Sequence, residues 1–195
     1  MYSFPSSRDG RHTPPAGMKN IVYFDLETKK SFDEVGGRGQ LRYLGVSIGV
    51  TYSTEREAYE VYGENRVNDL IDELRRADLV VGYNIIGFDF PVLQGENEFF
   101  DFEQVPSLDM MLDIQEAVDT RPPLDSVANG CLGIEKTAEG LQAVKWYREG
   151  KLLEIAEYCC YDVKITKLVH EYGRHHQQVH FTNRVGGKVT APVKW

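Results

Sequence analysis

Apolar residues in the first third of the sequence follow the spacing of β-strands. Residues 21–26 form a nearly continuous apolar run, which is typical of a strand buried on both faces. Residues 41–52 and 57–62 alternate between apolar and polar positions, as neighbouring strands of a meander do. A Gly-rich loop at 36–39 separates the first run from the second. The pattern therefore predicts three consecutive strands.

The spacing then changes to that of helices. Leu70, Ile71, Leu74 and Ala77 recur at helical intervals behind Asn68, a residue type that caps helices, and a short apolar strand follows at 79–81. Further helices are predicted over residues 88–94, 111–118, 124–131, 138–148 and 152–172. Three strands followed by alternating helices and strands predict an α/β fold, a mixed sheet with flanking helices.

The two ends of the chain differ from its middle. Residues 1–18 are rich in Pro, Ser, Gly and Arg without apolar periodicity, so we expect a disordered tail there and one domain over 19–195. Two strand-like segments flank Gly186 and Gly187 and predict a C-terminal β-hairpin at about 179–195.

Composition narrows the class of protein. The 195 residues are 42% apolar, which suffices for a buried core. No apolar run approaches the ~18 residues of a membrane helix, and the start lacks a secretory signal, so we expect neither membrane insertion nor secretion. Cys131, Cys159 and Cys160 are an odd number without zinc-ligand spacing, which indicates a reducing, cytoplasmic setting. We interpret Cys159 and Cys160 as small core residues of the last helix.

The net charge of −8 is unevenly distributed. Residues 21–163 hold 13 basic and 28 acidic residues, whereas residues 164–195 hold six basic and one acidic. Such an acidic body repels a phosphate backbone unless bound cations or the basic end offset the repulsion.

Two carboxylates end the first predicted strand. Asp25 and Glu27 are two residues apart in IVYFDLET, so they point to one face while Leu26 points into the core. A polar strand end is the alternative interpretation of this pair.

Three more candidate side chains occur further along the chain. Asp89 lies between Phe88 and Phe90 in VVGYNIIGFDFPVL, a costly place for an unpaired charge, although a helix cap is the alternative. Tyr158 and Asp162 are four apart in EYCCYDVKIT and share one helix face, which also fits an ordinary surface pair.

The four carboxylates could converge at one edge of the sheet. Such a cluster would raise the pKa of its own members, and a pair of divalent cations would remove that cost. Carboxylate oxygens suit Mg²⁺ or Mn²⁺, and two ions can clamp the attacking and leaving oxygens of a phosphoryl displacement.

The three motifs, FDLET, YNIIGFD and YCCYD, resemble in order and spacing those of the DEDD superfamily of 3′-5′ exonucleases, whose fold is ribonuclease H-like. The second and third are similar to those of family B DNA polymerase proofreading domains. Over about 20–172 the chain more strongly resembles a group of small stand-alone predicted exonucleases with a ribonuclease H-like fold, which are sometimes linked with helicases. Glu157 stands where one branch carries His, so the resemblance implies the Tyr branch.

The resemblance also implies roles for these residues. Asp25 would bridge two metal ions, Glu27 and Asp162 would complete the first metal site, and Asp89 would hold the second through water. Tyr158 would orient the attacking water. The expected activity is hydrolysis of phosphodiester bonds at the 3′ end of single-stranded DNA or RNA.

Contacts to the terminal nucleotide are also implied. Asn84 and Phe88 would shape its pocket, with core packing as the alternative for Phe88, and backbone groups near Leu26 and Thr28 would contact the 3′ end. Asp109 and Asp113 are interpreted as structural. Two other functions stay open: a nucleic-acid-binding or helicase-partner module on a nuclease fold, and a structure-selective endonuclease.

Overall fold

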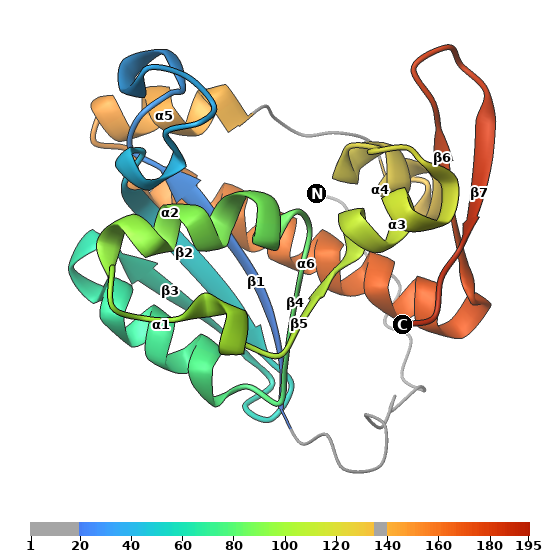
Figure 1. Ribbon diagram of the computed structural model, residues 1–195, viewed down its shortest axis with the longest axis horizontal. Coiled ribbons are helices and arrows are strands. Elements are labelled where there is room, and N and C mark those ends of the chain that lie inside the picture. The colour runs from blue at the N-terminus through green and yellow to red at the C-terminus, as the bar shows by residue number, and fades with distance from the viewer. Residues whose placement is uncertain (1–19, 135–139) are drawn as a thin grey trace, which may run out of the picture.

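The computed structural model describes residues 20–134 and 140–195 (Figure 1). The expected tail at 1–18 lies outside the described residues, as does the start of the helix expected at 138–148. The strands are β1 (Ile21–Thr28), β2 (Val46–Ser53), β3 (Ala58–Gly63), β4 (Leu79–Gly82), β5 (Ser107–Asp109), β6 (Gln178–Thr182) and β7 (Lys188–Pro192). The α-helices are α1 (Val67–Arg76), α2 (Phe90–Glu96), α3 (Met110–Val118), α4 (Leu124–Leu132), α5 (Gly140–Arg148) and α6 (Leu152–His176).

Five strands form a mixed sheet in the order β3-β2-β1-β4-β5. β1 pairs antiparallel with β2 and parallel with β4, β2 pairs antiparallel with β3, and β4 pairs parallel with β5. The predicted mixed sheet with flanking helices is therefore confirmed. The carboxyl ends of β1 and β4 meet at one edge of this sheet because the two strands are parallel.

Helices cover both faces of the sheet, with α1 and α2 on one side and α6 on the other (Figure 1). Alternate residues of β1 serve the two layers: Ile21 and Tyr23 join the core under α6, whereas Val22, Phe24 and Leu26 join the core under α1 and α2. β1 is thus buried on both faces, as its continuous apolar run predicts.

The strand predicted over residues 41–52 is shorter than expected. Residues 41–43 form a turn of 3-10 helix, η2 (Leu41–Tyr43), and β2 begins only at Val46. Gly45 between them has φ +68°, a left-handed conformation that interrupts the extended chain. The alternation of apolar residues over 41–52 therefore spans two different elements.

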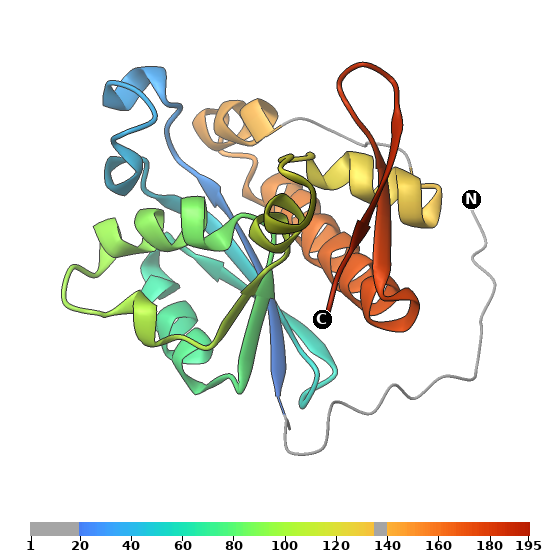
Figure 2. The ribbon, with the colours of Figure 1, turned by 45° about the vertical axis from the view of Figure 1, so that its right-hand side comes forward.

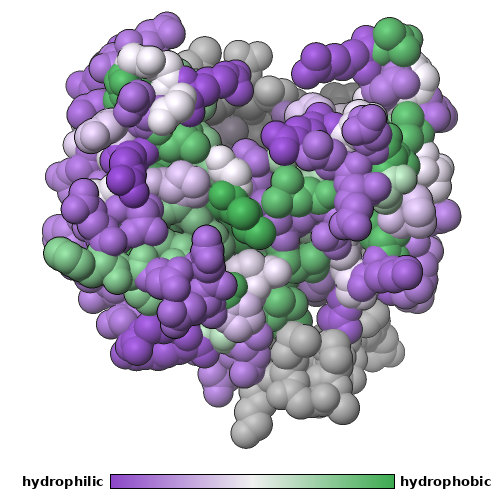
Figure 3. All heavy atoms as spheres, viewed as in Figure 1, coloured by the Kyte–Doolittle hydropathy of each residue, from purple (hydrophilic) through white to green (hydrophobic). Residues whose placement is uncertain are grey.

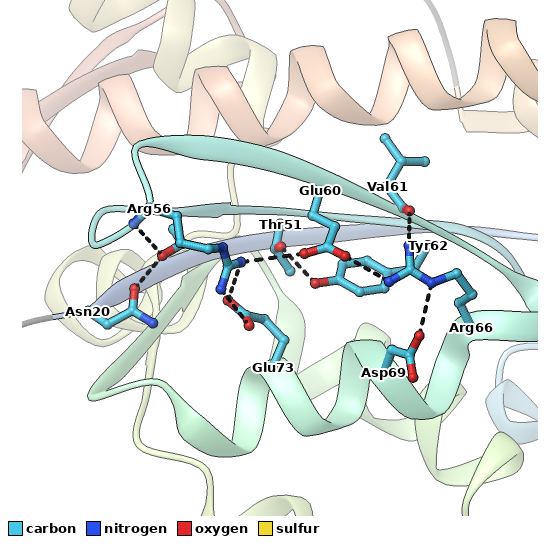
Figure 4. Close-up of polar contacts among 10 residues, drawn as sticks. Asn20, Thr51, Arg56, Glu60, Val61, Tyr62, Arg66, Asp69 and Glu73 are labelled. Atoms are coloured by element: carbon cyan, nitrogen blue, oxygen red, sulfur yellow. Dashed lines mark hydrogen bonds and ion pairs between the residues drawn. The ribbon is translucent and has the colours of Figure 1, made fainter.

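The first helix also begins differently from the prediction. A 3-10 turn, η3 (Glu64–Arg66), leads into α1, so Asn68 lies within the helix and does not cap it. Ion pairs hold α1 near the edge strand β3: Arg56, in the turn before β3, makes a two-pronged contact with Glu73 of α1, and Arg66 of η3 contacts both Glu60 of β3 and Asp69 of α1 (Figure 4).

β6 and β7 form the predicted C-terminal hairpin, which stands beside α6, away from the central sheet (Figure 2). Its turn spans 183–187, wider than the Gly-Gly turn expected, because Asn183 accepts hydrogen bonds from the N–H groups of Val185 and Gly187. The hairpin packs on α4, where a Cβ at Gly130 would lie 2.2 Å from the backbone oxygen of His180.

The last helix is longer than predicted, because α6 continues to His176 before Gln177 adopts a left-handed conformation. The three-residue strand β5 was not predicted. No helix in the described part of the chain combines the length and apolar character needed to cross a membrane.

Candidate active site

The end of β1 supplies two carboxylates to one face of the sheet. Asp25 and Glu27 point toward α6, while Leu26 between them is buried in the opposite core. The pairing with β2 shifts register between Glu27 and Thr28. Such irregularities re-aim side chains next to functional sites.

Helix α6 crosses behind β1 and adds the third carboxylate. Ligand oxygens of Asp25, Glu27 and Asp162 lie within 4.8 Å of one another. Tyr158, one helical turn before Asp162, hydrogen-bonds to it. The structure therefore brings four of the five predicted catalytic side chains to one point, and we call Asp25, Glu27 and Asp162 the acidic triad.

The fifth predicted residue, Asp89, comes from a turn that follows β4. This turn is π-helical, η4 (Ile85–Asp89), and leads directly into α2. The Asp89 side chain, 3% exposed, makes no capping hydrogen bond to α2. Its Oδ1 instead accepts a hydrogen bond from the backbone N–H of Leu26 at 3.2 Å. The alternative of a helix cap is therefore not what the structure shows.

Burial and mutual repulsion dominate the electrostatics of these carboxylates. Burial and the charge of Asp162 raise the pKa of Asp25 well above its ordinary value. Burial and the charges of Asp25 and Asp162 raise the pKa of Glu27. For Asp89, burial and the charge of Asp25 have the same effect on the pKa. Without a cation, the cluster therefore resists full ionisation.

The Tyr158 phenol is held in its protonated form. Burial and the charges of the acidic triad raise the pKa of Tyr158 far above its ordinary value. Its ring packs edge to face against Trp146 of α5, with the ring centroids 6.3 Å apart. Tyr158 can therefore donate or accept a hydrogen bond but cannot act as a strong base at neutral pH.

A cavity of about 300 Å³ opens beside the carboxylates. The side chains of Asp25, Glu27 and Asp89 line it, together with the four predicted substrate contacts Leu26, Thr28, Asn84 and Phe88. Phe88 packs edge to face on Phe32 in the wall, with the ring centroids 6.1 Å apart. In the space-filling view, hydrophobic residues gather around the start of α2 within a hydrophilic surround (Figure 3).

Several residues of this region were not singled out from the sequence. Lys30, Phe32 and Val144 also line the cavity. Cys159, interpreted as a core residue, is buried but also donates a hydrogen bond from Sγ to Asp25 Oδ2 at 3.4 Å. A signal was available for Cys159, because it directly follows Tyr158 and helix geometry keeps it near the same strand. Val144 carried none, since an ordinary apolar helix residue does not reveal which surface it faces.

The donor set fits hard divalent cations. Three carboxylates converge within 4.8 Å, and burial together with the neighbouring negative charges raises the pKa values of Asp25 and Glu27. Mg²⁺ and Mn²⁺ prefer oxygen ligands of this kind, and a bound cation would relieve the repulsion. Asp25, Glu27 and Asp162 could hold one ion, and Asp89 borders the same cavity.

Comparison with known proteins agrees with this architecture. A family model described as RNase_H superfamily matches residues 22–174. Among the solved structures, the family B DNA polymerase from the hyperthermophilic archaeon Pyrobaculum calidifontis is similar, with a TM-score of 0.64 and 17% sequence identity. The match covers 82% of this chain and 25% of the polymerase chain, so the chain corresponds to about a quarter of that protein. No curated protein matches the sequence.

Proposed function

The chain belongs to the RNase_H superfamily, and from this premise we propose that it is a divalent-cation-dependent 3′-5′ exonuclease of the Tyr branch of the DEDD superfamily. The observation that carries the proposal is the acidic triad, whose ligand oxygens lie within 4.8 Å of one another, beside a cavity also lined by Asp89. The fold supports nuclease activity, and the acidic triad together with Asp89 supports a cleavage reaction that depends on divalent cations.

In this proposal each carboxylate has a defined task. Asp25 would bridge two cations, Glu27 and Asp162 would complete the first ion's site, and Asp89 would hold the second ion through water. When bound, such cations lower the pKa of water and neutralise charge on a phosphate. The raised pKa values of the free carboxylates support these roles, because groups that repel one another gain most from an added cation.

Tyr158 would orient the attacking water. Its phenol stays protonated, and the hydrogen bond to Asp162 fixes its position beside the acidic triad. Water would form a bond to the last internucleotide phosphorus while the bond to the preceding 3′ oxygen breaks. The products would be a nucleoside 5′-monophosphate and a strand that is one residue shorter with a new 3′ hydroxyl.

The cavity would receive the 3′-terminal nucleotide of a single strand. Asn84 offers an amide for hydrogen bonding, and the paired rings of Phe32 and Phe88 offer an apolar surface for a base. Stacking on such a surface tolerates any base. Lys30 at the cavity edge could approach a phosphate. Frayed DNA or RNA ends would fit equally well, and a helicase is the kind of partner that would supply them.

The test uses 5′-labelled single-stranded DNA and RNA oligomers of one sequence, with Mn²⁺, Mg²⁺ or EDTA. We expect a ladder that shortens from the 3′ end, requires the divalent ion, and is absent with Asp25→Asn. A closed circular strand of the same composition serves as the control for end dependence, and it should remain intact.

Each alternative outcome has a distinct meaning. Cleavage of the circle would replace the exonuclease with an endonuclease. Binding of the oligomers without cleavage under any metal condition would overturn the enzymatic proposal in favour of a docking module. Cleavage that persists in EDTA would overturn the role of the carboxylates as cation ligands.

A further inference from the structure

Asp109, outside the proposed catalytic set, is one of the most buried charged side chains among the described residues. It is 3% exposed and lies where β5 ends and α3 begins. Its Oδ1 accepts hydrogen bonds from the N–H groups of Met111 at 3.1 Å and Leu112 at 3.4 Å, which caps α3. A helix cap alone does not require burial of a carboxylate, because most caps lie at the surface.

The same carboxylate also binds the turn that follows β4. Oδ1 accepts from the N–H of Asn84 at 2.8 Å, and Oδ2 accepts from the N–H of Ile86 at 3.0 Å. These contacts reach 25 and 23 residues back along the chain. Asp109 thus joins two segments of the structure, with both of its oxygens in use.

The turn held in this way has an unusual backbone. Asn84 adopts a left-handed conformation with φ +67°, and the π-helical turn η4 follows it directly. Both features are uncommon and persist only where the surroundings hold them in place. The two hydrogen bonds that Asp109 accepts satisfy the N–H groups of Asn84 and Ile86 at the start of this turn, where the helix itself offers them no acceptor.

The turn that Asp109 holds contains three residues of the proposed site. Asn84 and Phe88 line the cavity, and Asp89 at the end of the turn accepts the hydrogen bond from Leu26 N–H. Asp109 itself does not line that cavity. We infer that Asp109 is a positioning residue: by holding the N–H groups of Asn84 and Ile86, it sets where Asn84, Phe88 and Asp89 lie. This inference rests on the proposed function, since it concerns how that site is assembled.

Two substitutions separate the task of holding the turn from that of capping α3. In Asp109→Asn, an amide oxygen at the Oδ1 position keeps three of the four hydrogen bonds, but its NH₂ group then faces the N–H of Ile86. In Asp109→Ser, the hydroxyl can still cap α3 but is too short to reach the turn. Asp113→Asn is the matched control, because Asp113 is on the same helix and accepts a hydrogen bond from Trp195 Nε1 at 2.9 Å.

The experiment combines amide hydrogen exchange by NMR, Mn²⁺ binding by calorimetry, and single-turnover cleavage of the labelled oligomer. Asp109→Asn should accelerate exchange at Ile86 about 10-fold, the value of one lost hydrogen bond, and leave Met111 and Leu112 unchanged. It should also weaken Mn²⁺ binding and lower the cleavage rate about 10-fold or more. Asp109→Ser should affect Asn84 and Ile86 together. Asp113→Asn should match the wild type in all three measurements.

The outcomes distinguish this inference from the proposed function. If the wild type cleaves no oligomer, the proposed function fails, while exchange at Ile86 and Mn²⁺ binding still decide whether Asp109 holds the turn. If the wild type cleaves and Asp109→Asn matches it in rate and Mn²⁺ affinity, the positioning role is overturned. Equal acceleration of exchange across α3 and the turn would mean a purely structural role and would also overturn it.

Discussion

Asp89 accepts its hydrogen bond from the backbone N–H of Leu26, a residue 63 positions earlier and flanked by the two carboxylates of β1. The second motif is therefore tied to the backbone of the first. Because Leu26 is fixed in the core under α2, the bond gives Asp89 the rigidity of the sheet.

Tyr158→Phe should reduce the cleavage rate about 10- to 100-fold, because one hydrogen bond to the attacking water is lost while the ring still packs on Trp146. Single-turnover cleavage measures the effect. Mn²⁺ affinity should be unchanged, and Tyr161→Phe on the same helix is the control. Full activity in Tyr158→Phe would contradict the role of the hydroxyl.

Asp25→Asn should stabilise the cation-free protein at neutral pH. The pKa of Asp25 is raised by burial and by Asp162, so its ionised form opposes folding, and stability is lost as pH rises above the ordinary value near 3.8. Urea unfolding in EDTA should therefore show a gap between variant and wild type that widens from pH 5 to pH 7.

The same variant should lose its response to metal. Mn²⁺ at 100 times its dissociation constant should stabilise the wild type by about 2.7 kcal/mol, because the ion binds only the folded state. Asp25→Asn should gain far less. If both proteins gain equally, the ion binds outside the acidic triad.

His170 should make the protein sensitive to mild acid. Burial, with the charges of Arg174 and Lys167, lowers the pKa of His170 to about 3, and its Nδ1 lies 2.9 Å from the hydroxyl of Tyr23. The unfolded chain takes up this proton near pH 6.5, so stability should fall below that pH by up to about 1.4 kcal/mol per unit.

Unfolding of a His170→Gln variant between pH 4.5 and 7 checks this prediction. The variant should show a shallower dependence on pH over that range than the wild type. His176→Asn, at an exposed position of the same helix, is the control and should keep the wild-type slope. A slope that is unchanged in His170→Gln would assign the acid sensitivity to other groups.

Lys30→Ala should weaken binding of a single strand without changing the rate of cleavage at saturation. Lys30 borders the cavity, and losing one phosphate contact should reduce the dependence of log affinity on log salt by about 0.7. Fluorescence anisotropy in EDTA at several salt concentrations measures the slope. Arg75→Ala, distant on α1 and paired with Asp72, should leave the slope unchanged.

Gly130→Ala should destabilise the protein, although alanine favours helices by about 1 kcal/mol over glycine. The added Cβ would lie 2.2 Å from the backbone oxygen of His180, so the hairpin must move off α4. We expect a net loss of about 2 kcal/mol in urea unfolding. Gly39→Ala is the control, because nothing lies within 4 Å of its Cβ position.

Much of the fold could be predicted because local pattern and tertiary burial agree. The apolar run of β1 is continuous because both faces are covered, and the spacing of Asp25 and Glu27 fixes their common face. The 3-10 turn at Leu41–Tyr43 could not be predicted, because Gly45 breaks a strand whose alternation continues across the break. The prediction that Asn68 caps the first helix was wrong for a similar reason, because the 3-10 turn η3 precedes it and the helix has already begun there.

The sequence predicted which carboxylates belong to the candidate site, but not the contacts that hold them in place. Carboxylates in apolar surroundings stand out in a sequence because their burial is costly. The sequence identifies Asp109 only as a structural residue, because an Asp before a helix is ordinary, and only the folded chain shows that its oxygens reach Asn84 and Ile86. Contacts to the backbone groups of a distant segment cannot be predicted from residue type, because almost every residue has the same backbone N–H group.

Cys159 and Asp25, whose side chains are in contact, are 134 residues apart in the sequence. Closing so long a loop costs conformational entropy before the contact stabilises the fold, and domains rich in such contacts fold slowly. Until α6 docks, Asp162 is far from Asp25 and Glu27, and its charge repels theirs only weakly. During refolding, recovery of cleavage should therefore trail recovery of helix content, and a divalent cation added at the start should act on the final step rather than on the first.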